Sequence, residues 1–246
     1  MTSSTTEAGS RTREAECARQ TLDSHKGEIT VPIWDLPVRL GHWSMVLLFA
    51  SSWLTGKLGW LTWHRWLGYV LLVLIVFRIY WGIAGSTTAR FSSFLRGPRL
   101  GWAHARVLFT RLSDGTLGHT PLGGWNVVVM LSLLLIQVIL GLFTVDVDGL
   151  ESGPLSDLVS FETGRQFALW HARTVNVLIA FIILHLTAIL HYWLYKRDNL
   201  VRPMVTGVKR LPSGTPPPNF PTFWRAVLGL LGAALLVAAV VTRLQF

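Results

Sequence analysis

Residues 169–193 read LWHARTVNVLIAFIILHLTAILHYW, an apolar run that contains three histidines and no acidic residue. A membrane-spanning helix needs about 20 mostly apolar residues, and this run is long enough. Ionisable side chains inside a membrane are costly, and they usually serve a function. The stretch therefore predicts a spanning helix, and the roles of His171, His185 and His191 become the central question.

The whole chain has the composition of a membrane protein. Of its 246 residues, 51% are hydrophobic and 14% are charged, whereas soluble domains carry about 25% charged residues. The net charge of +9 comes from Lys and Arg placed between long apolar runs, which fits membrane topology better than nucleic-acid binding. The single cysteine, Cys17, forms no internal disulfide, and the chain has no C-x-x-C-H haem motif or iron–sulfur cysteine set. Electron transfer would therefore require a metal held by histidine.

Five apolar segments are long enough to cross a bilayer. They run from about Val38 to Gly56, Trp63 to Ala84, Leu122 to Thr144, Phe167 to Tyr195 and Phe223 to Val241. The fifth follows a proline-rich stretch that cannot continue a helix. We therefore expect an all-α membrane protein. It would comprise a flexible tail at 1–30, a four-helix transmembrane bundle at 31–210, a linker at 211–222 and a fifth, C-terminal transmembrane helix at 223–246.

The distribution of charge predicts the orientation. Residues 1–30 lack the apolar core of a cleavable signal peptide. Basic residues gather before the first helix, between the second and third, and after the fourth, while the loop between the third and fourth is acidic. The positive-inside rule then places the N-terminus in the cytoplasm and the C-terminus on the outer side of the membrane. The mixed segment 91–112 is expected to lie along the cytoplasmic surface.

Depth in the membrane decides which histidines can meet. In this topology His42 and His185 lie toward the cytoplasm, and His64 and His171 lie toward the outside. The 14 residues between His171 and His185 correspond to about 21 Å of helix, and their directions differ by about 40°. The sequence therefore predicts two pairs at two levels, His42 with His185 and His64 with His171.

Two histidine pairs in an apolar bundle suit two b-type haems, each with two histidine ligands. Zinc is the alternative metal, but no cysteine or carboxylate stands at a zinc spacing beside these histidines. Gly68, four residues after His64, would let a flat ring approach the helix. Haem propionates need cationic partners, and three arginines lie within three residues of the predicted ligands. These arginines, which otherwise serve as topology charges, are Arg39, Arg65 and Arg173.

Further polar residues mark the cytoplasmic rim. His191 is six residues past His185 and is rotated by about 120° from it, so it cannot share that ligand's direction. Together with His119 and Lys196, it forms a candidate quinone site, where a rim histidine would exchange a proton. The alternative for His191 is an interfacial side chain with no chemical role.

Several ordered motifs carry a resemblance to a known family. They are VPIWDLPVRLGHW at 31–43, the run from TWHRWLGY to FLRGP at 62–98, LGHTPLGGW at 117–125, WHARTVNVLIAFIILHLTAIL at 170–190 and KRDNLVRPMVTG at 196–207. Over about residues 31–210 the chain resembles the bacterial cytochrome b561 family, which includes the cytochrome b subunits of nickel–iron hydrogenases. The resemblance implies a four-helix bundle with two b haems. Their implied ligands are His42, His64, His171 and His185.

The resemblance also implies electron transfer between the two membrane faces, usually with quinone. The first hypothesis is a di-haem relay between the quinone pool and an outer redox partner such as a hydrogenase or c-type cytochrome. The second is a self-sufficient superoxide:quinone oxidoreductase, against which the acidic third loop argues. A transporter or channel is a third class. Its polar path would have to be built from Arg78, Asn126, Gln137 and Asn176 in otherwise apolar helices.

Overall fold

Helices dominate the protein. The computed structural model describes residues 27–95, 118–147 and 151–242. In chain order the elements are β1 (Glu28–Pro32), α2 (Leu36–Lys57), α3 (Leu61–Ala84), α4 (Phe91–Phe94), α6 (Pro121–Leu142), a 3-10 turn (Ser156–Leu158), α7 (Phe161–Leu194), α8 (Val201–Thr206), β2 (Val208–Pro212) and α9 (Phe223–Thr242). Each of the five predicted apolar segments corresponds to one long helix.

Side chains before the long helices define where several of them begin. Asp35 accepts a hydrogen bond from the Val38 amide at the start of α2, at 2.8 Å. Thr120 and Ser160 accept from amides in the first turns of α6 and α7, each at 3.2 Å. These caps satisfy amides that have no partner within the helix. The helix starts are therefore encoded locally in the sequence.

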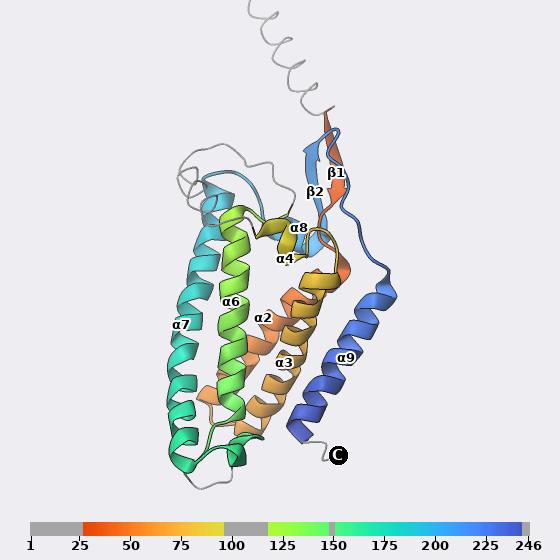
Figure 1. The fold of residues 1–246 in the computed structure, drawn as a ribbon. Coiled ribbons are helices and arrows are strands. Elements are labelled where there is room, and N and C mark those ends of the chain that lie inside the picture. Colours follow the sequence, from red (N-terminus) through yellow and green to blue (C-terminus); the bar gives the residue numbers. More distant parts are fainter. Residues whose placement is uncertain (1–26, 96–117, 148–150, 243–246) are drawn as a thin grey trace, which may run out of the picture.

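The bundle is built around α3. Helix α2 packs along α3, and α6 packs along α7, while α3 also contacts α6 (Figure 1). Helix α9 lies on α3 outside this group of four. The fully buried side chains of Ile75 and Trp81 belong to α3, as expected for the helix with most neighbours.

Four of the described helices are long and apolar enough to cross a membrane. They are α3, α6 from Leu122 onward, α7 and α9. Helix α2 has a similar length but does not meet the same criterion of apolar composition. It is more polar because it contains Arg39, His42, Lys57 and several serines. Because α2 lies beside α3, its crossing of the bilayer is part of the proposal below.

The two ends of the bundle differ in structure and charge. One end, here called the sheet end, carries α4, α8 and the antiparallel pair β1–β2, in which Glu28 faces Pro212 and Pro32 faces Val208 (Figure 1). The other, here called the loop end, holds the α2–α3 turn and the α6–α7 connection. All described chain segments with basic clusters lie at the sheet end, and the acidic connection lies at the loop end. The C-terminus of α9 also lies at the loop end.

The small sheet differs from the wholly helical expectation. Strand β1 includes residues 28–30 of the expected tail, and β2 includes Leu211 and Pro212 of the expected linker. These strands pair across about 180 residues of sequence, so no local pattern announces them. The rest of the tail, including Cys17 and His25, and most of the expected surface segment 91–112 lie outside the described residues.

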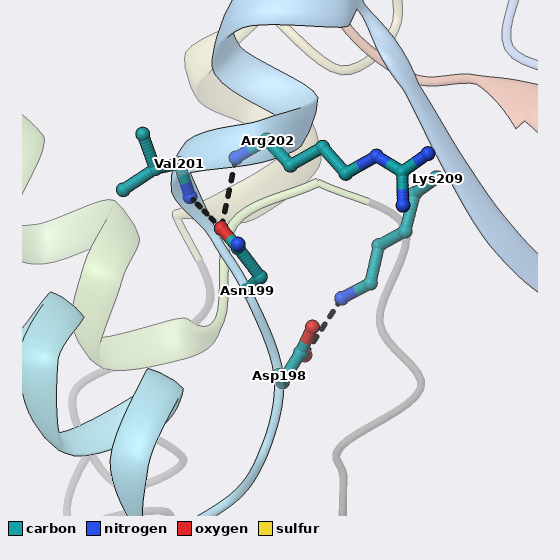
Figure 2. Close-up of polar contacts among 5 residues, drawn as sticks. All are labelled: Asp198, Asn199, Val201, Arg202 and Lys209. Atoms are coloured by element: carbon teal, nitrogen blue, oxygen red, sulfur yellow. Dashed lines mark hydrogen bonds and ion pairs between the residues drawn. The ribbon is translucent and has the colours of Figure 1, made fainter.

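Polar contacts fix the chain where it leaves α7 at the sheet end (Figure 2). The Asn199 side chain accepts hydrogen bonds from the amides of Val201 and Arg202, at 3.0 and 2.9 Å, and so holds the first turn of α8. Lys209 of β2 forms an ion pair with Asp198 at 2.7 Å. Both charged side chains are largely buried. These contacts connect α7, α8 and β2 into one unit.

Helix α9 approaches α3 closely through a glycine. A Cβ atom at Gly229 would collide with the ring of Tyr80 on α3, and the Tyr80 hydroxyl donates to the Arg225 carbonyl at 3.3 Å. Ala226 and Ala233 on the same helix are buried in this contact. Small residues of this kind let membrane helices pack closely.

This contact predicts that two glycines of α9 differ in their tolerance of a larger side chain. Gly229→Leu should destabilise the protein by about 1–3 kcal/mol, because the Tyr80 ring leaves no room for the new side chain. Gly232→Leu is the matched control, since nothing lies within 4 Å of its Cβ position. Thermal unfolding of both variants in detergent checks this. Equal melting temperatures for the two would contradict the packing of α9 on α3.

Candidate functional site

The structure brings His64 and His171 together at the loop end. His64 lies near the start of α3, and His171 lies in the first third of α7. Their ring centroids are 5.8 Å apart, and the ring planes are nearly perpendicular, at 89°. The two imidazoles that topology predicts at the same depth are therefore neighbours.

Both imidazoles direct Nδ1 at a main-chain carbonyl of an adjacent helix. Nδ1 of His64 lies 2.8 Å from the Ser52 carbonyl of α2, and Nδ1 of His171 lies 2.8 Å from the Gln137 carbonyl of α6. A carbonyl can only accept, so each Nδ1 carries the proton and donates it. The Nε2 lone pair of each ring is then left to bind a metal, which is the usual arrangement of a ligating histidine.

The same local pattern surrounds both rings. A glycine stands four residues after each acceptor carbonyl, Gly56 after Ser52 and Gly141 after Gln137. A Cβ atom at Gly56 would lie 3.0 Å from Nδ1 of His64, and one at Gly141 would lie 3.0 Å from Cε1 of His171. Each glycine therefore makes the space in which a histidine of the next helix reaches the carbonyl.

A cavity of about 220 Å³ adjoins this pair. Both histidines line it, together with Gly68, Gly141, Arg65 and Arg165. Arg65 forms an ion pair with Glu151 at 3.1 Å, and Arg165 donates to the Val145 carbonyl at 3.5 Å. The cavity thus combines apolar space, two ring nitrogens and two guanidinium groups.

Arg165 is a cavity residue that is not among the predicted propionate partners. Its signal is its position, since it is the one basic residue in the acidic stretch before His171. Arg173, which the sequence analysis includes as a propionate partner, is not among the residues that line the cavity. Its guanidinium instead lies 5.5 Å from the centroid of the Trp170 ring.

His42 and His185 lie close enough to interact electrostatically, toward the sheet end. The His185 Nδ1 atom is 3.3 Å from the Asn126 amide nitrogen of α6. Nδ1 of His42 is buried and has no hydrogen-bond partner in the described part of the chain. Arg39, one turn before His42, donates to the Val205 carbonyl at 2.6 Å. This pair therefore has a looser set of hydrogen bonds than the pair at the loop end.

The three candidate quinone residues lie at the sheet end in two settings. His119 is enclosed between the rings of Trp34 and Phe94, at 4.7 and 4.6 Å. His191 stacks on Tyr195, with centroids 5.1 Å apart, and the Lys196 amine lies 4.9 Å from the Tyr192 ring. His119 lies two residues before α6, His191 lies in the last turn of α7, and Lys196 follows the end of α7.

Burial determines the charge of His119. The Nδ1 atom of His119 is buried, and desolvation, followed by the positive charge of Arg78, lowers the pKa of His119 to about 3. Its imidazole is therefore neutral at physiological pH. It also interacts electrostatically with His185 and His42, so it belongs to the surroundings of that pair.

Comparison with known proteins identifies the family. The family described as prokaryotic cytochrome b561 matches residues 33–207. The chain belongs to this family. Prokaryotic b561 cytochromes are membrane proteins of electron transfer that carry b-type haem, and these properties agree with the apolar helices.

One curated relative gives a more specific similarity. The chain is 21% identical over 212 residues to a protein of Azotobacter chroococcum mcd 1 named probable Ni/Fe-hydrogenase B-type cytochrome subunit. The alignment covers 73% of this chain and 88% of that protein. No solved structure matches the chain.

The residues at the loop end fit a b-type haem. Two neighbouring histidines use Nδ1 for hydrogen bonds and keep Nε2 available, and both line a cavity that glycines and two arginines also line. Within the described ranges, no three His, Cys, Asp or Glu side chains gather as a metal site would require. The histidines instead occur in twos, which is the number that a bis-histidine haem takes.

The environment of His119 predicts a pH dependence of stability. Between about pH 6.5 and 3 the unfolded chain binds a proton at this imidazole and the folded chain does not. The contribution of neutral His119 to the free energy of unfolding is therefore fully present above pH 6.5 and is lost as the pH falls toward 3. This contribution is on the order of a few kcal/mol. His119→Gln should flatten this fall in a series of melting curves from pH 8 to pH 4. An unchanged pH profile in the variant would contradict the neutral, buried state of His119.

Proposed function

We propose that this b561 cytochrome is a transmembrane di-haem electron relay. It would exchange electrons with a redox partner at the loop end and with quinone near the sheet end. The observation that carries the proposal is the His64–His171 pair, in which both Nδ1–H groups are donated to main-chain carbonyls. An imidazole held in this tautomer and orientation is prepared to bind a metal through Nε2.

Each haem would be held by one histidine pair. His64 and His171 would hold the outer one, and His42 and His185 the inner one, about 21 Å apart along α7. When bound, haem supplies one-electron redox chemistry between its ferric and ferrous states. The chain's own residues provide space at Gly56, Gly68 and Gly141 and fix the imidazoles through carbonyls and amides.

Cationic side chains near both histidine pairs support the binding of haem propionates beside them. Arg65 and Arg165 lie on the cavity beside the outer pair, and Arg39 lies one turn from His42. A guanidinium group binds a carboxylate strongly because two of its N–H groups can donate to the two oxygens in parallel. We assign Arg65, Arg165 and Arg39 to the haem propionates. The role of Arg173 as a propionate partner stays a prediction from the sequence.

The topology follows from the charge at the two ends. The sheet end, with its basic segments, would face the cytoplasm of a bacterium, and the acidic loop end would face the periplasm. Helix α2 would then be a spanning helix beside α3, so that α2, α3, α6 and α7 form the bundle and α9 is a fifth span. The N-terminus would be cytoplasmic and the C-terminus periplasmic.

The partners follow from the positions of the two sites. The Azotobacter relative is named as a hydrogenase cytochrome subunit, so a hydrogenase or another redox protein such as a c-type cytochrome is proposed at the loop end. Quinone is proposed near His119, His191 and Lys196, where neutral His119 would act as a hydrogen-bonding group. The ion pair of Arg65 with Glu151 weakens the case for superoxide as a substrate, because it places a carboxylate beside one of the two cations on this cavity.

Single histidine substitutions test the two-haem arrangement. His64→Ala and His171→Ala should each lower the haem content by about half and remove the same b-type component from a redox titration. His42→Ala and His185→Ala should each remove the other component. Haem content and reduced-minus-oxidised spectra of the purified proteins measure this.

His191→Ala serves as the matched control on the same helix. It should leave both components in place, because His191 faces away from the direction of His185. If His42→Ala and His64→Ala remove the same component, the proposed pairing is wrong. If all four substitutions leave the haem content intact, the proposed haem sites are wrong.

A further inference from the structure

Gln137 is a buried polar residue in the apolar helix α6, and its side chain reaches across to α7. Its Nε2 atom donates to the main-chain carbonyl of His171 at 3.0 Å. Its Oε1 atom accepts a hydrogen bond from the Thr174 hydroxyl, which also lies 2.9 Å from the Trp170 carbonyl of its own helix. Only 8% of its surface is exposed. A buried amide in a membrane helix must satisfy its polar atoms within the protein, and Gln137 does so on the turn that carries His171.

The same residue also holds the imidazole ring of His171. Nδ1 of the ring lies 2.8 Å from the Gln137 carbonyl and 3.2 Å from its Nε2 atom. Because the carbonyl can only accept, Nδ1 carries a proton and cannot accept from the amide as well. The amide nitrogen of Gln137 therefore donates one of its two hydrogens to the His171 carbonyl. Gln137 thus contacts His171 twice, with its main chain at the ring and with its side chain at the backbone.

The other histidines have weaker versions of this arrangement. His64 donates to the Ser52 carbonyl at the same distance, 2.8 Å, but the Ser52 hydroxyl contacts only the ring, at 3.3 Å. Asn126 stands eleven residues before Gln137, about 20° beyond three full turns and so on the same face of α6. Its shorter amide reaches Nδ1 of His185 at 3.3 Å. The double contact therefore distinguishes His171.

We propose that Gln137, together with Thr174, is a positioning residue for His171. By tying the α7 backbone at His171 and Thr174 to α6, its side chain keeps the ring in register with the Gln137 carbonyl. The Nδ1–H···O=C bond makes the imidazole a more basic ligand, and ligand basicity is one of the factors that set the potential of a haem. Gln137 thereby tunes the outer haem and leaves the inner one unaffected. This inference rests on the proposed outer haem site.

The first test removes the amide. In Gln137→Leu, the midpoint potential of one haem should rise, because the weaker Nδ1–H bond makes His171 a poorer donor to ferric iron. The potential of the other haem should not change. The low-spin ferric EPR signal of the affected haem should shift, because the orientation of the His171 ring changes. This haem should also dissociate from the protein about 10-fold faster. Asn176→Leu is the matched control, since Asn176 is exposed on α7 and donates to the Ala172 carbonyl.

The second test separates hydrogen bonding from packing and does not need the Leu variant to fold. Thr174→Val keeps the shape of Thr174 and removes its hydroxyl, while Thr174→Ser keeps the hydroxyl and removes a methyl group. A positioning role through Gln137 predicts that Val shifts the potential in the same direction as Gln137→Leu and that Ser does not. If Thr174 acts only through helix packing, Thr174→Ser should shift the potential more than Thr174→Val does.

The outcomes distinguish this inference from the proposed function. If His171→Ala removes one haem but Gln137→Leu and Thr174→Val leave both potentials and the EPR signals unchanged, the positioning role is wrong and the haem site stands. If His171→Ala removes no haem, the proposed function itself fails. A shift of both haems by equal amounts in Gln137→Leu would also overturn the inference, because it would indicate a general disturbance of the bundle.

Discussion

An imidazole among hydrocarbon side chains has an N–H group that no water can satisfy, and leaving that group without a partner costs free energy. At the loop end the protein meets this constraint twice in the same way, with Nδ1 of His64 and of His171 each 2.8 Å from a carbonyl of a neighbouring helix. These two hydrogen bonds connect α3 to α2 and α7 to α6, use the space that Gly56 and Gly141 leave, and keep Nε2 of each ring available. The constraint therefore links the packing of the bundle to its proposed chemistry.

Much of this arrangement is predictable from the sequence. Apolar length predicts the long helices, and their alternating direction with the rise of a helix predicts that His64 and His171 lie at one depth. Contacts between helices are less predictable, because rotation about each helix axis is set by packing that no local pattern records. The roles of Gln137, Arg165 and Gly56 follow from that rotation. The pair β1–β2 depends on contacts between residues that are far apart in the chain, such as Ile29 and Leu211.

The two histidine pairs differ in how firmly their surroundings hold them. The loop-end pair is fixed by main-chain carbonyls and by the Gln137 side chain. Near the sheet end, Nδ1 of His42 has no partner in the described ranges, and His185 has a single side-chain amide at 3.3 Å. Neutral, buried His119 stands in the same region. The proposed relay therefore joins an outer pair that is held by main-chain hydrogen bonds to an inner pair that has fewer hydrogen-bond partners.

The most direct test of this account is the haem-to-protein ratio of the purified full-length chain, measured with its redox titration. The account predicts two b-type haems per chain that titrate as two components, since each histidine pair would hold one. A preparation that is folded and holds a single haem, or none, would contradict it.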